Sequence, residues 1–212
     1  MIKPTAKQVV DELLELYEDL LVPFMKVRRD MPFPTEDRQE TDTEHAFTLA
    51  VLAPTIAERL GLKLNENLII KYAVVHDLVE AYAGDISVRH AESYQNKADK
   101  EHEAFLKIEK RFKASAPWIV NTVRAYENRT DAEARFVYAT DKLMGSLTRL
   151  VDRGETWAEY YPETDGSGFH AVVERLRKKA EAYPELLELF DAVHNHLDAQ
   201  WPGYLGVPPK NQ

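Results

Sequence analysis

The chain has 212 residues, 44% of them hydrophobic, which is enough for one domain with a sizeable core and argues against intrinsic disorder. Its 27 Lys and Arg residues against 36 Asp and Glu give a net charge of −9, which opposes general affinity for polymeric nucleic acid, and the absence of cysteine excludes disulfides, thiolate metal sites and cysteine nucleophiles. With only 8 glycines an all-β architecture is disfavoured, so we expect an all-α fold. No apolar run is long enough to cross a bilayer, so we expect a cytoplasmic protein without a membrane span.

The first predicted helix begins at a capping box formed by Thr5 and Gln8, after which apolar residues recur at helical spacing until Pro23. Residues 23–40, which contain several prolines and charged residues, predict an irregular connection. This connection is long for a compact domain, and long ordered loops are often functional.

A second capping box, formed by Thr41 and Glu44, opens a helix that Gly61 ends. Pro54 inside this helix predicts a kink, because proline removes one backbone hydrogen bond. His45 falls in the first turn, so the helix presents a histidine beside its own amino terminus.

The third predicted helix is capped by Asn65 and ends near Gly84. Within it His76 and Glu80 are i and i+4 neighbours, so the sequence predicts that both side chains project from one side of the helix. Residues 86–98 are polar and lack a clear period, and they predict a loop or a short helix.

The rest of the chain predicts further helices. A third capping box, Thr130 with Glu133, precedes a helix on whose mostly apolar stripe Asp141 lies, and glycines near residue 166 mark a loop. We see no domain boundary and expect a single domain over residues 1–212, with a core at about 10–150 and a C-terminal helical extension at about 151–212. The other predicted helices cover residues 104–112, 117–126, 169–182 and 184–197.

Three places on these helices carry ionisable side chains where a core-facing helix normally has Leu or Val: His45, the pair His76 and Asp77, and Asp141. Burying a charge is costly unless the charge is paired or coordinates a metal. Two imidazoles and two carboxylates suit a first-row divalent ion, with water completing its shell. Each residue also has a plain structural interpretation: a surface histidine, a solvated helix acid, or a buried salt bridge of Asp141 with Lys142 or Arg149.

Three segments of the chain carry a family resemblance. They are Glu-Thr-Asp-Thr-Glu-His at residues 40–45, His-Asp-Leu-Val-Glu-Ala-Tyr-Ala-Gly-Asp at residues 76–85, and Ala-Arg-Phe-Val-Tyr-Ala-Thr-Asp-Lys-Leu at residues 134–143. In this order they resemble the HD-domain metal-dependent phosphohydrolases, most of all the 5′-deoxynucleotidase branch, over roughly residues 10–150.

The resemblance implies a compact helical bundle that holds one divalent transition-metal ion, which could be Mn, Co, Fe, Ni or Zn. Such an ion polarises a phosphate oxygen and lowers the pKa of a bound water. His90 and His102 are candidates for a second metal, but their spacing fits no ligand pair on one helix face and favours surface histidines. The implied metal ligands are His45, His76, Asp77 and Asp141.

Two further acids receive roles from the same resemblance. Glu80 is implied as the catalytic acid or base, and the alternative is that it orients His76 by accepting the imidazole N–H. Asp85 is implied as a catalytic residue on the substrate side of the site, and its plain interpretation is a helix-exit turn after Gly84.

An arginine in the loop before the first metal histidine holds the phosphate in this family. Of Arg28, Arg29 and Arg38, we favour Arg29 by its separation from the histidine. Asp30 follows it, where members of the family have an aromatic residue that helps to reject a ribose 2′-hydroxyl, so strict deoxy preference stays open. The lysines expected on solvated helix faces are Lys71, Lys110 and Lys142.

We therefore expect a phosphomonoesterase that releases phosphate from (deoxy)nucleoside 5′-monophosphates by attack of a metal-activated water. The alternatives are an HD-type dNTP triphosphohydrolase and a catalytically silent metal-binding regulatory or scaffold domain. Retention of Glu80 and Asp85 beside all four candidate ligands argues against the silent domain. The expected partners are a small-molecule nucleotide and a second copy of the chain in a homodimer.

Overall fold

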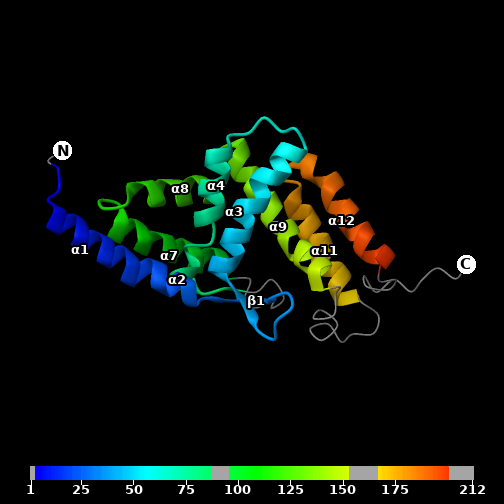
Figure 1. Ribbon diagram of the computed structural model, residues 1–212, viewed down its shortest axis with the longest axis horizontal. Helices are drawn as coiled ribbons and strands as arrows, with labels where there is room; N and C mark the ends of the chain where they lie inside the picture. Colours follow the sequence, from blue (N-terminus) through cyan, green and yellow to red (C-terminus); the bar gives the residue numbers. More distant parts are fainter. Residues whose placement is uncertain (1–2, 87–95, 153–166, 201–212) are drawn as a thin grey trace, which may run out of the picture.

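The computed structural model describes residues 3–86, 96–152 and 167–200, and this part of the chain is helical apart from one hairpin of two short strands (Figure 1). The predicted all-α class is confirmed. Most of the predicted loop at 86–98 and the loop before residue 167 lie outside the described residues. The elements in chain order are α1 (Ala6–Leu16), the π-helical turn η1 (Tyr17–Leu21), α2 (Val22–Lys26), β1 (Arg28–Pro32), β2 (Gln39–Thr41), α3 (Asp42–Arg59), α4 (Glu66–Val75), α5 (Glu80–Ala83), α7 (Lys97–Phe112), α8 (Pro117–Glu127), α9 (Ala132–Asp152), α11 (Ser167–Ala180), the 3-10 turn η2 (Pro184–Leu186) and α12 (Leu187–Gln200).

The first helix begins as predicted but does not end at Pro23. Thr5 and the side chain of Gln8 form the capping box, and the helix continues through η1 into α2, which has Pro23 in its first turn. Pro23 has no N–H to donate to the carbonyl of Asp19, and the hydroxyl of Tyr82 donates to that oxygen instead, at 2.8 Å. A side chain from another element thus satisfies the backbone group that the proline releases.

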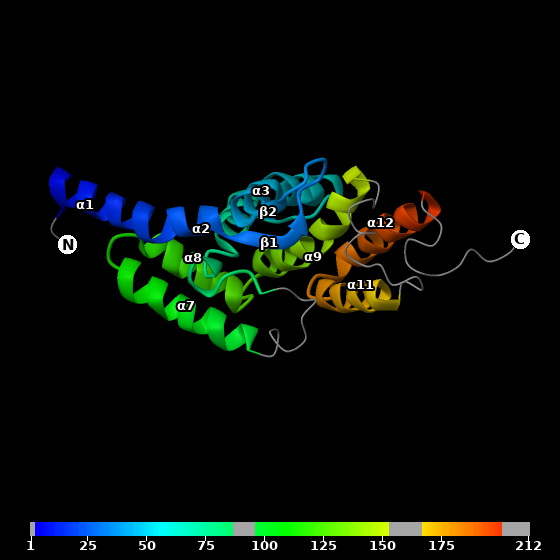
Figure 2. The same ribbon diagram turned by 90° about the horizontal axis from the view of Figure 1, so that it is seen from below.

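The connection at residues 23–40, predicted to be irregular, contains an antiparallel hairpin. Arg28 lies opposite Thr41, and Pro32 lies opposite Gln39. Strands of five and three residues are too short to give a clear periodic signal in the sequence. β2 leads directly into α3, so the hairpin is anchored at the start of that helix (Figure 2).

The third predicted helix is interrupted. α4 begins at its predicted cap, where the side chain of Asn65 accepts from the N–H of Leu68, but the helix ends at Val75. Tight turns follow, in which for example the N–H of Glu80 donates to the carbonyl of Asp77 at 2.8 Å. α5 then ends at Gly84, whose φ of +72° is a conformation that favours glycine.

α3 agrees with its prediction and α9 departs from it. α3 has the predicted capping box and continues through its internal proline to the predicted glycine stop. Asp131 rather than Thr130 caps α9, because its Oδ1 accepts from the N–H of Ala134 at 2.8 Å. Glu133 instead accepts from the N–H of Asn65 at 2.8 Å, which ties the start of α9 to the start of α4.

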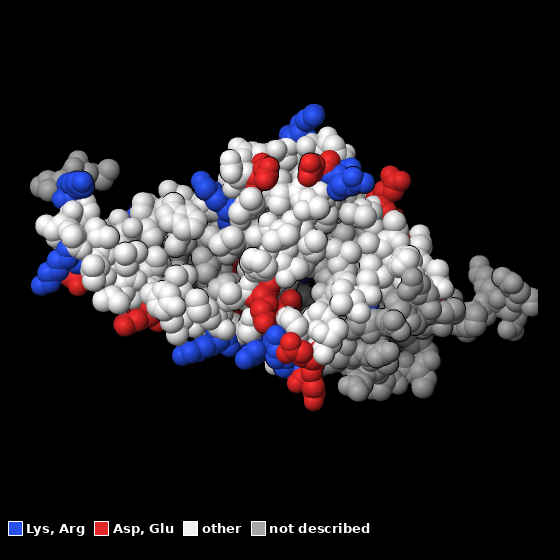
Figure 3. All heavy atoms as spheres, viewed as in Figure 1, with Lys and Arg blue, Asp and Glu red and all other residues white. Residues whose placement is uncertain are grey.

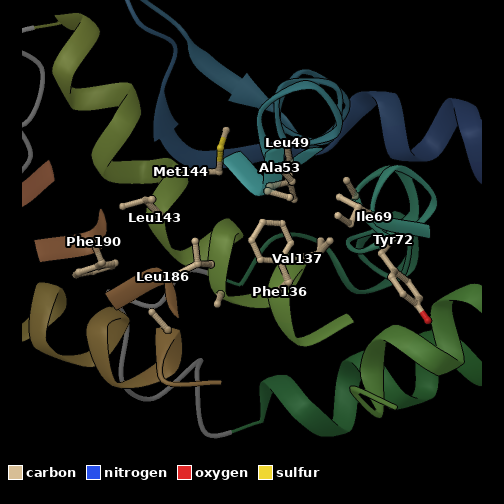
Figure 4. Close-up of a cluster of buried hydrophobic side chains, with 14 of the residues drawn as sticks. Leu49, Ala53, Ile69, Tyr72, Phe136, Val137, Leu143, Met144, Leu186 and Phe190 are labelled. Carbon is tan, nitrogen blue, oxygen red and sulfur yellow. The ribbon is translucent and has the colours of Figure 1, made fainter. Parts of the chain in front are cut away.

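Two buried apolar clusters hold the helices together. The larger joins α3, α4 and α9 to the C-terminal elements, with Phe136 and Leu143 of α9 in the same cluster as Leu186 and Phe190 (Figure 4). The second cluster joins η1, α2 and the facing residues of α3 and α4 to α7 and α8, and α5 packs against it. The C-terminal helices thus pack into the same core as the helices that carry the motifs. Among the described helices, none is long and apolar enough to cross a membrane.

Candidate metal centre

Three elements that are distant in sequence bring two histidines and an aspartate to one place. His45 lies in the first turn of α3, His76 directly follows α4, and Asp141 lies in the middle of α9. One ligand atom from each lies within 4.8 Å of the other two, and all three residues are buried. Burial of polar groups at one point needs a compensating partner, and this set of atoms suits a divalent metal ion.

His76 directs its Nε2 atom toward this cluster. Its Nδ1 lies 2.9 Å from the carbonyl oxygen of Ala73, which can only accept, so Nδ1 carries a hydrogen and Nε2 is the nitrogen that a metal ion can bind. Nε2 is buried, has no hydrogen-bond partner in the described part of the chain, and lies 2.9 Å from Oδ2 of Asp77 and 3.9 Å from Oδ1 of Asp141. A buried ring nitrogen beside two carboxylate oxygens is a place where one divalent cation can bind all three groups. The residues present therefore fit a divalent ion.

His45 has an acid on each side of its ring. Nε2 lies 2.9 Å from Oδ1 of Asp141, and Nδ1 lies 3.6 Å from Oε2 of Glu40, a residue that is 6% exposed. Burial and the charge of Arg29 oppose protonation, but the interactions with Asp141 and Glu40 raise the pKa of His45 overall. Glu40 can orient the ring, a role that the sequence analysis missed although Glu40 opens the first motif segment.

Asp77, the fourth predicted ligand, is held by Arg29. Nη1 of Arg29 lies 2.8 Å from Oδ2 of Asp77 and 3.2 Å from Oδ1 of Asp42. Burial disfavours the ionised form of Asp77, but the neighbouring imidazole of His76 and the charge of Arg29 lower its pKa below the usual value. Asp42, Asp77 and Glu80 also form a second group of acids whose oxygens lie within 4.8 Å of one another.

Arg29 is the arginine candidate that contacts the cluster. Arg38 binds the carboxylate of Glu44 at 2.8 and 2.9 Å, and Arg28 is exposed. Burial opposes the charge of Arg29, but the acids around it, first Asp77, raise its pKa above the usual value. Arg29, the residue predicted to bind the phosphate, therefore places a fully charged guanidinium beside the histidines.

Lys142 belongs to this site rather than to a solvated helix face, and it forms the ion pair with Asp141 that the sequence left open as an alternative. Its ammonium group pairs with Oδ2 of Asp141, and its side chain lines the same cavity. Burial opposes both charges, yet the pair lowers the pKa of Asp141 and raises that of Lys142. Lys71 and Lys110 are exposed, as predicted.

Glu80 is a buried acid beside the cluster. It is 2% exposed, its Oε1 lies 3.3 Å from Nζ of Lys97, and its Oε2 has no hydrogen-bond partner among the described residues. Burial, and then the charge of Asp77, raises the pKa of Glu80 well above its usual value. Glu80 therefore has the character of a proton donor near neutral pH. Lys97 was not among the predicted site residues, because it lies inside the stretch 86–98, which lacks a clear period.

Asp85 lies just beyond the helix-stop glycine, as predicted. Its Oδ2 accepts from the N–H of Asp30 at 2.7 Å, which joins the end of α5 to the hairpin. Burial raises the pKa of Asp85. Of the two histidines considered for a second metal, His102 is exposed on α7, and His90 lies outside the described residues.

These groups surround a cavity of about 150 Å³. Its lining contains cations such as Arg29, Lys97 and Lys142 together with the acids Glu80 and Asp85. Charged side chains of both signs also gather over the β1–β2 hairpin on the face shown in Figure 3. A cavity with a metal-competent cluster, a buried acid and fixed cations is suited to a phosphate ester.

Named proteins similar to this chain include deoxynucleotidases. Human 5′-deoxynucleotidase HDDC2 is 26% identical over 151 residues, which cover 68% of this chain and 72% of that protein. The protein of the same name from Xenopus laevis is 26% identical over 164 residues, which cover 74% of each chain.

Solved structures show the same fold. A predicted metal-dependent phosphohydrolase from Magnetospirillum magnetotacticum MS-1 superposes with a TM-score of 0.75 at 23% identity, and the match covers 96% of this chain and 99% of that chain. A conserved hypothetical protein from Pyrococcus furiosus gives a TM-score of 0.57 at 23% identity, with 88% and 99% covered.

The family model described as HD domain matches residues 26–184, a range that includes all three motif segments and most of the chain. This match confirms the resemblance that the motifs indicated. The chain belongs to the HD domain family.

Proposed function

We propose that this protein releases inorganic phosphate from (deoxy)nucleoside 5′-monophosphates in a metal-dependent reaction. The observation that supports this most directly is the buried cluster of His45, His76 and Asp141, with Asp77 and Arg29 at its edge. The relatives named 5′-deoxynucleotidase point to the same class of substrate.

The two histidines and two aspartates would hold one divalent transition-metal ion, and Mn, Co, Fe, Ni and Zn all accept such ligands. When bound, this ion would polarise a phosphate oxygen and lower the pKa of a bound water. The carboxylates of Asp77 and Asp141 would balance its charge. Ala73 would keep His76 in the tautomer that can act as a ligand.

Arg29 would bind the phosphate group. Asp77 and Asp42 fix the guanidinium through one nitrogen, Nη1, at 2.8 and 3.2 Å. A guanidinium has five N–H donors, so this anchoring leaves others for phosphate oxygens. The positive charge is therefore in position before the substrate arrives.

Glu80 would move the proton. Attack of water on phosphorus releases a proton to the solvent, and the departing ester oxygen must gain one from an acid in the site. A carboxylic acid kept protonated by burial can donate to that oxygen, and Lys97, 3.3 Å from Oε1, would then stabilise the carboxylate. Asp85 would contact the sugar side of the substrate from the opposite end of α5.

A nucleotide panel tests this proposal. Purified protein with Mn²⁺, Co²⁺ or Zn²⁺ is incubated with deoxy- and ribonucleoside monophosphates and with deoxynucleoside triphosphates, and phosphate is detected with malachite green, with and without pyrophosphatase. Phosphate release from monophosphates without pyrophosphatase is expected. Turnover of triphosphates alone would support the triphosphohydrolase, and metal binding without any turnover would support the silent domain.

We also propose a homodimer, with α1 in its interface. No residue of α1 is buried, and its exposed apolar side chains include Val10, Leu13 and Leu14, each more than half exposed. Burial of such a surface against a second copy removes it from water. Light scattering after size exclusion should give a dimer mass, and Leu13→Asp with Leu14→Asp should give a monomer; a monomeric natural chain would contradict the proposal.

A further inference from the structure

The cavity extends beyond the metal centre, and its other end has a different composition. This end is formed by one residue of β1, three of α9 and two of α11, and none of them has a role in the proposed hydrolysis. They are Met31, Gly145, Thr148, Arg149, Val172 and Leu176.

This far end lies along α9. Asp141, Gly145 and Thr148 follow at intervals of four and three residues, so they lie on one side of the helix. Arg149 is eight residues beyond Asp141, which corresponds to about 12 Å along the helix axis. A phosphate held at the metal centre would therefore place the rest of a nucleotide beside Gly145 and Thr148.

Gly145 has no side chain, and the side chain of Met31 in β1 occupies the space beside it. A Cβ at this position would lie 2.9 Å from Cε of Met31, so any larger residue would displace that side chain. Glycine inside a helix is less favourable than alanine, so its presence in α9 needs a packing reason. Here it lets the flexible, polarisable side chain of Met31 lie against the helix and line the cavity, as suits a flat ring.

α11 supplies the facing wall. Val172 and Leu176 are i and i+4 neighbours, so they point the same way, and both line the cavity. Val173, the next residue along, belongs to the main hydrophobic cluster instead. Val172 is 5% exposed and Val173 is 7% exposed, so the two residues are buried alike. They differ in that Val172 lines the cavity and Val173 packs in the hydrophobic cluster.

Arg149 closes the same end with a buried guanidinium that is 1% exposed. Its planar fork of N–H donors matches groups with hydrogen-bond acceptors, such as the carbonyl oxygens and ring nitrogens of a nucleobase. An apolar wall with a few convergent polar groups is the usual composition of a small-molecule site.

We propose that Met31, Val172, Leu176 and Arg149 bind the nucleobase of the substrate. Helix α11, in the C-terminal extension, would thereby make the enzyme select nucleotides over other phosphomonoesters. This inference rests on the proposed function, because it takes the phosphate to be held at the metal centre. It assigns to the C-terminal extension a part in substrate choice.

The test compares a substrate with a base and one without. Deoxynucleoside 5′-monophosphates and 2-deoxyribose 5-phosphate are hydrolysed by the natural protein and by Val172→Ala, Val172→Phe and the matched control Val173→Ala. Val172→Ala should raise KM for nucleotides about 5- to 10-fold with little change in kcat, since two methyl groups leave the wall. Val172→Phe should lower kcat/KM for nucleotides more than 10-fold, by filling the cavity.

For 2-deoxyribose 5-phosphate both Val172 variants should stay within about 2-fold of the natural protein, because this substrate has no base. Val173→Ala should lower the melting temperature but keep the preference for nucleotides. Calorimetric titration of each compound into Glu80→Gln protein gives the same comparison as binding alone.

The outcomes separate the two proposals. If the natural protein hydrolyses both substrates equally, or if Val172 and Val173 variants change the ratio alike, base recognition by α11 is refuted and the phosphohydrolase stands. If no phosphomonoester is hydrolysed with any metal, the proposed function is refuted, and equal binding of the two compounds to Glu80→Gln protein would then refute the base site separately.

Discussion

Nε2 of His45 lies 2.9 Å from Oδ1 of Asp141, although 96 residues separate them in the chain. An ion bound between them would link α3 to α9 in the folded state only. At 100 times its dissociation constant, such a ligand adds about 2.7 kcal/mol to stability. At about 2–4 °C per kcal/mol for a chain of this size, Mn²⁺ should raise the melting temperature by about 5–10 °C.

Differential scanning fluorimetry with Mn²⁺ and with EDTA measures this shift. Asp141→Asn should show little or none of it, because the ligand charge is gone. An equal shift in Asp141→Asn protein would mean that the ion binds elsewhere.

Asp77→Ala should abolish metal binding and activity together. It removes the carboxylate that lies 2.9 Å from Nε2 of His76 and leaves Arg29 in the site. The matched control is Asp42→Asn, since Asp42 also binds Arg29, at 3.2 Å, but is not among the proposed ligands. Metal content by mass spectrometry should fall in the first variant only, and normal turnover of Asp77→Ala would end the metal hypothesis.

Glu80→Gln should retain the metal and lose activity by about 10²- to 10⁴-fold, the usual contribution of acid–base catalysis. The amide keeps the size of the side chain but cannot donate a carboxylic proton. Glu101→Gln is the control, because Glu101 also pairs with Lys97, at 3.1 Å, on the outer side. If both variants lose rate equally, Lys97 rather than the acid is responsible.

Tyr72→Phe should lower the free energy of unfolding by about 1.5 kcal/mol, because a hydrogen bond to a carboxylate is lost. The hydroxyl of Tyr72 in α4 donates to Asp131, the residue that caps α9. Urea unfolding of Tyr72→Phe, Asp131→Ala and the double variant forms a cycle. The double variant should lose less unfolding free energy than the sum of the losses in the two single variants. Strictly additive losses would show that the contact contributes nothing.

Protonation of His194 should lower the free energy of unfolding as the pH falls. Its Nε2 lies 2.9 Å from Oγ of Ser146 and its Nδ1 lies 2.8 Å from the carbonyl of Phe190. Burial lowers its pKa below the usual value. Arg149 acts in the same direction, and the hydrogen bond with Phe190 and the charge of Asp191 oppose the shift. The neutral form therefore favours folding, and this contribution is complete above the unfolded pKa of about 6.5 and is lost as pH falls below it.

Melting temperatures at pH 7.5 and pH 5.5 check this effect. His194→Gln keeps polar atoms but does not titrate, so the drop between the two pH values should be smaller than in the natural protein. An unchanged drop would assign the acid sensitivity to other groups.

The helix starts could be predicted from the sequence because capping is local. Thr5 with Gln8, and Thr41 with Glu44, satisfy backbone N–H groups within three residues, so neighbouring residues decide the outcome. The order of the motif residues that indicated the family could likewise be read from the sequence alone. Where a distant group competes, local rules failed: Glu133 binds the backbone of Asn65 instead of completing a capping box.

Only the tertiary structure decided how the site is assembled. The hairpin that carries Arg29 to Asp77, the break after Val75, the place of Lys142 in the cavity and the wall formed by α11 all depend on contacts between residues far apart in the chain. Periodicity describes one face of one element and contains no information on which other element meets it. The sequence by itself therefore determined the helical class, several helix starts and the candidate ligands, and packing determined the cavity that surrounds those ligands.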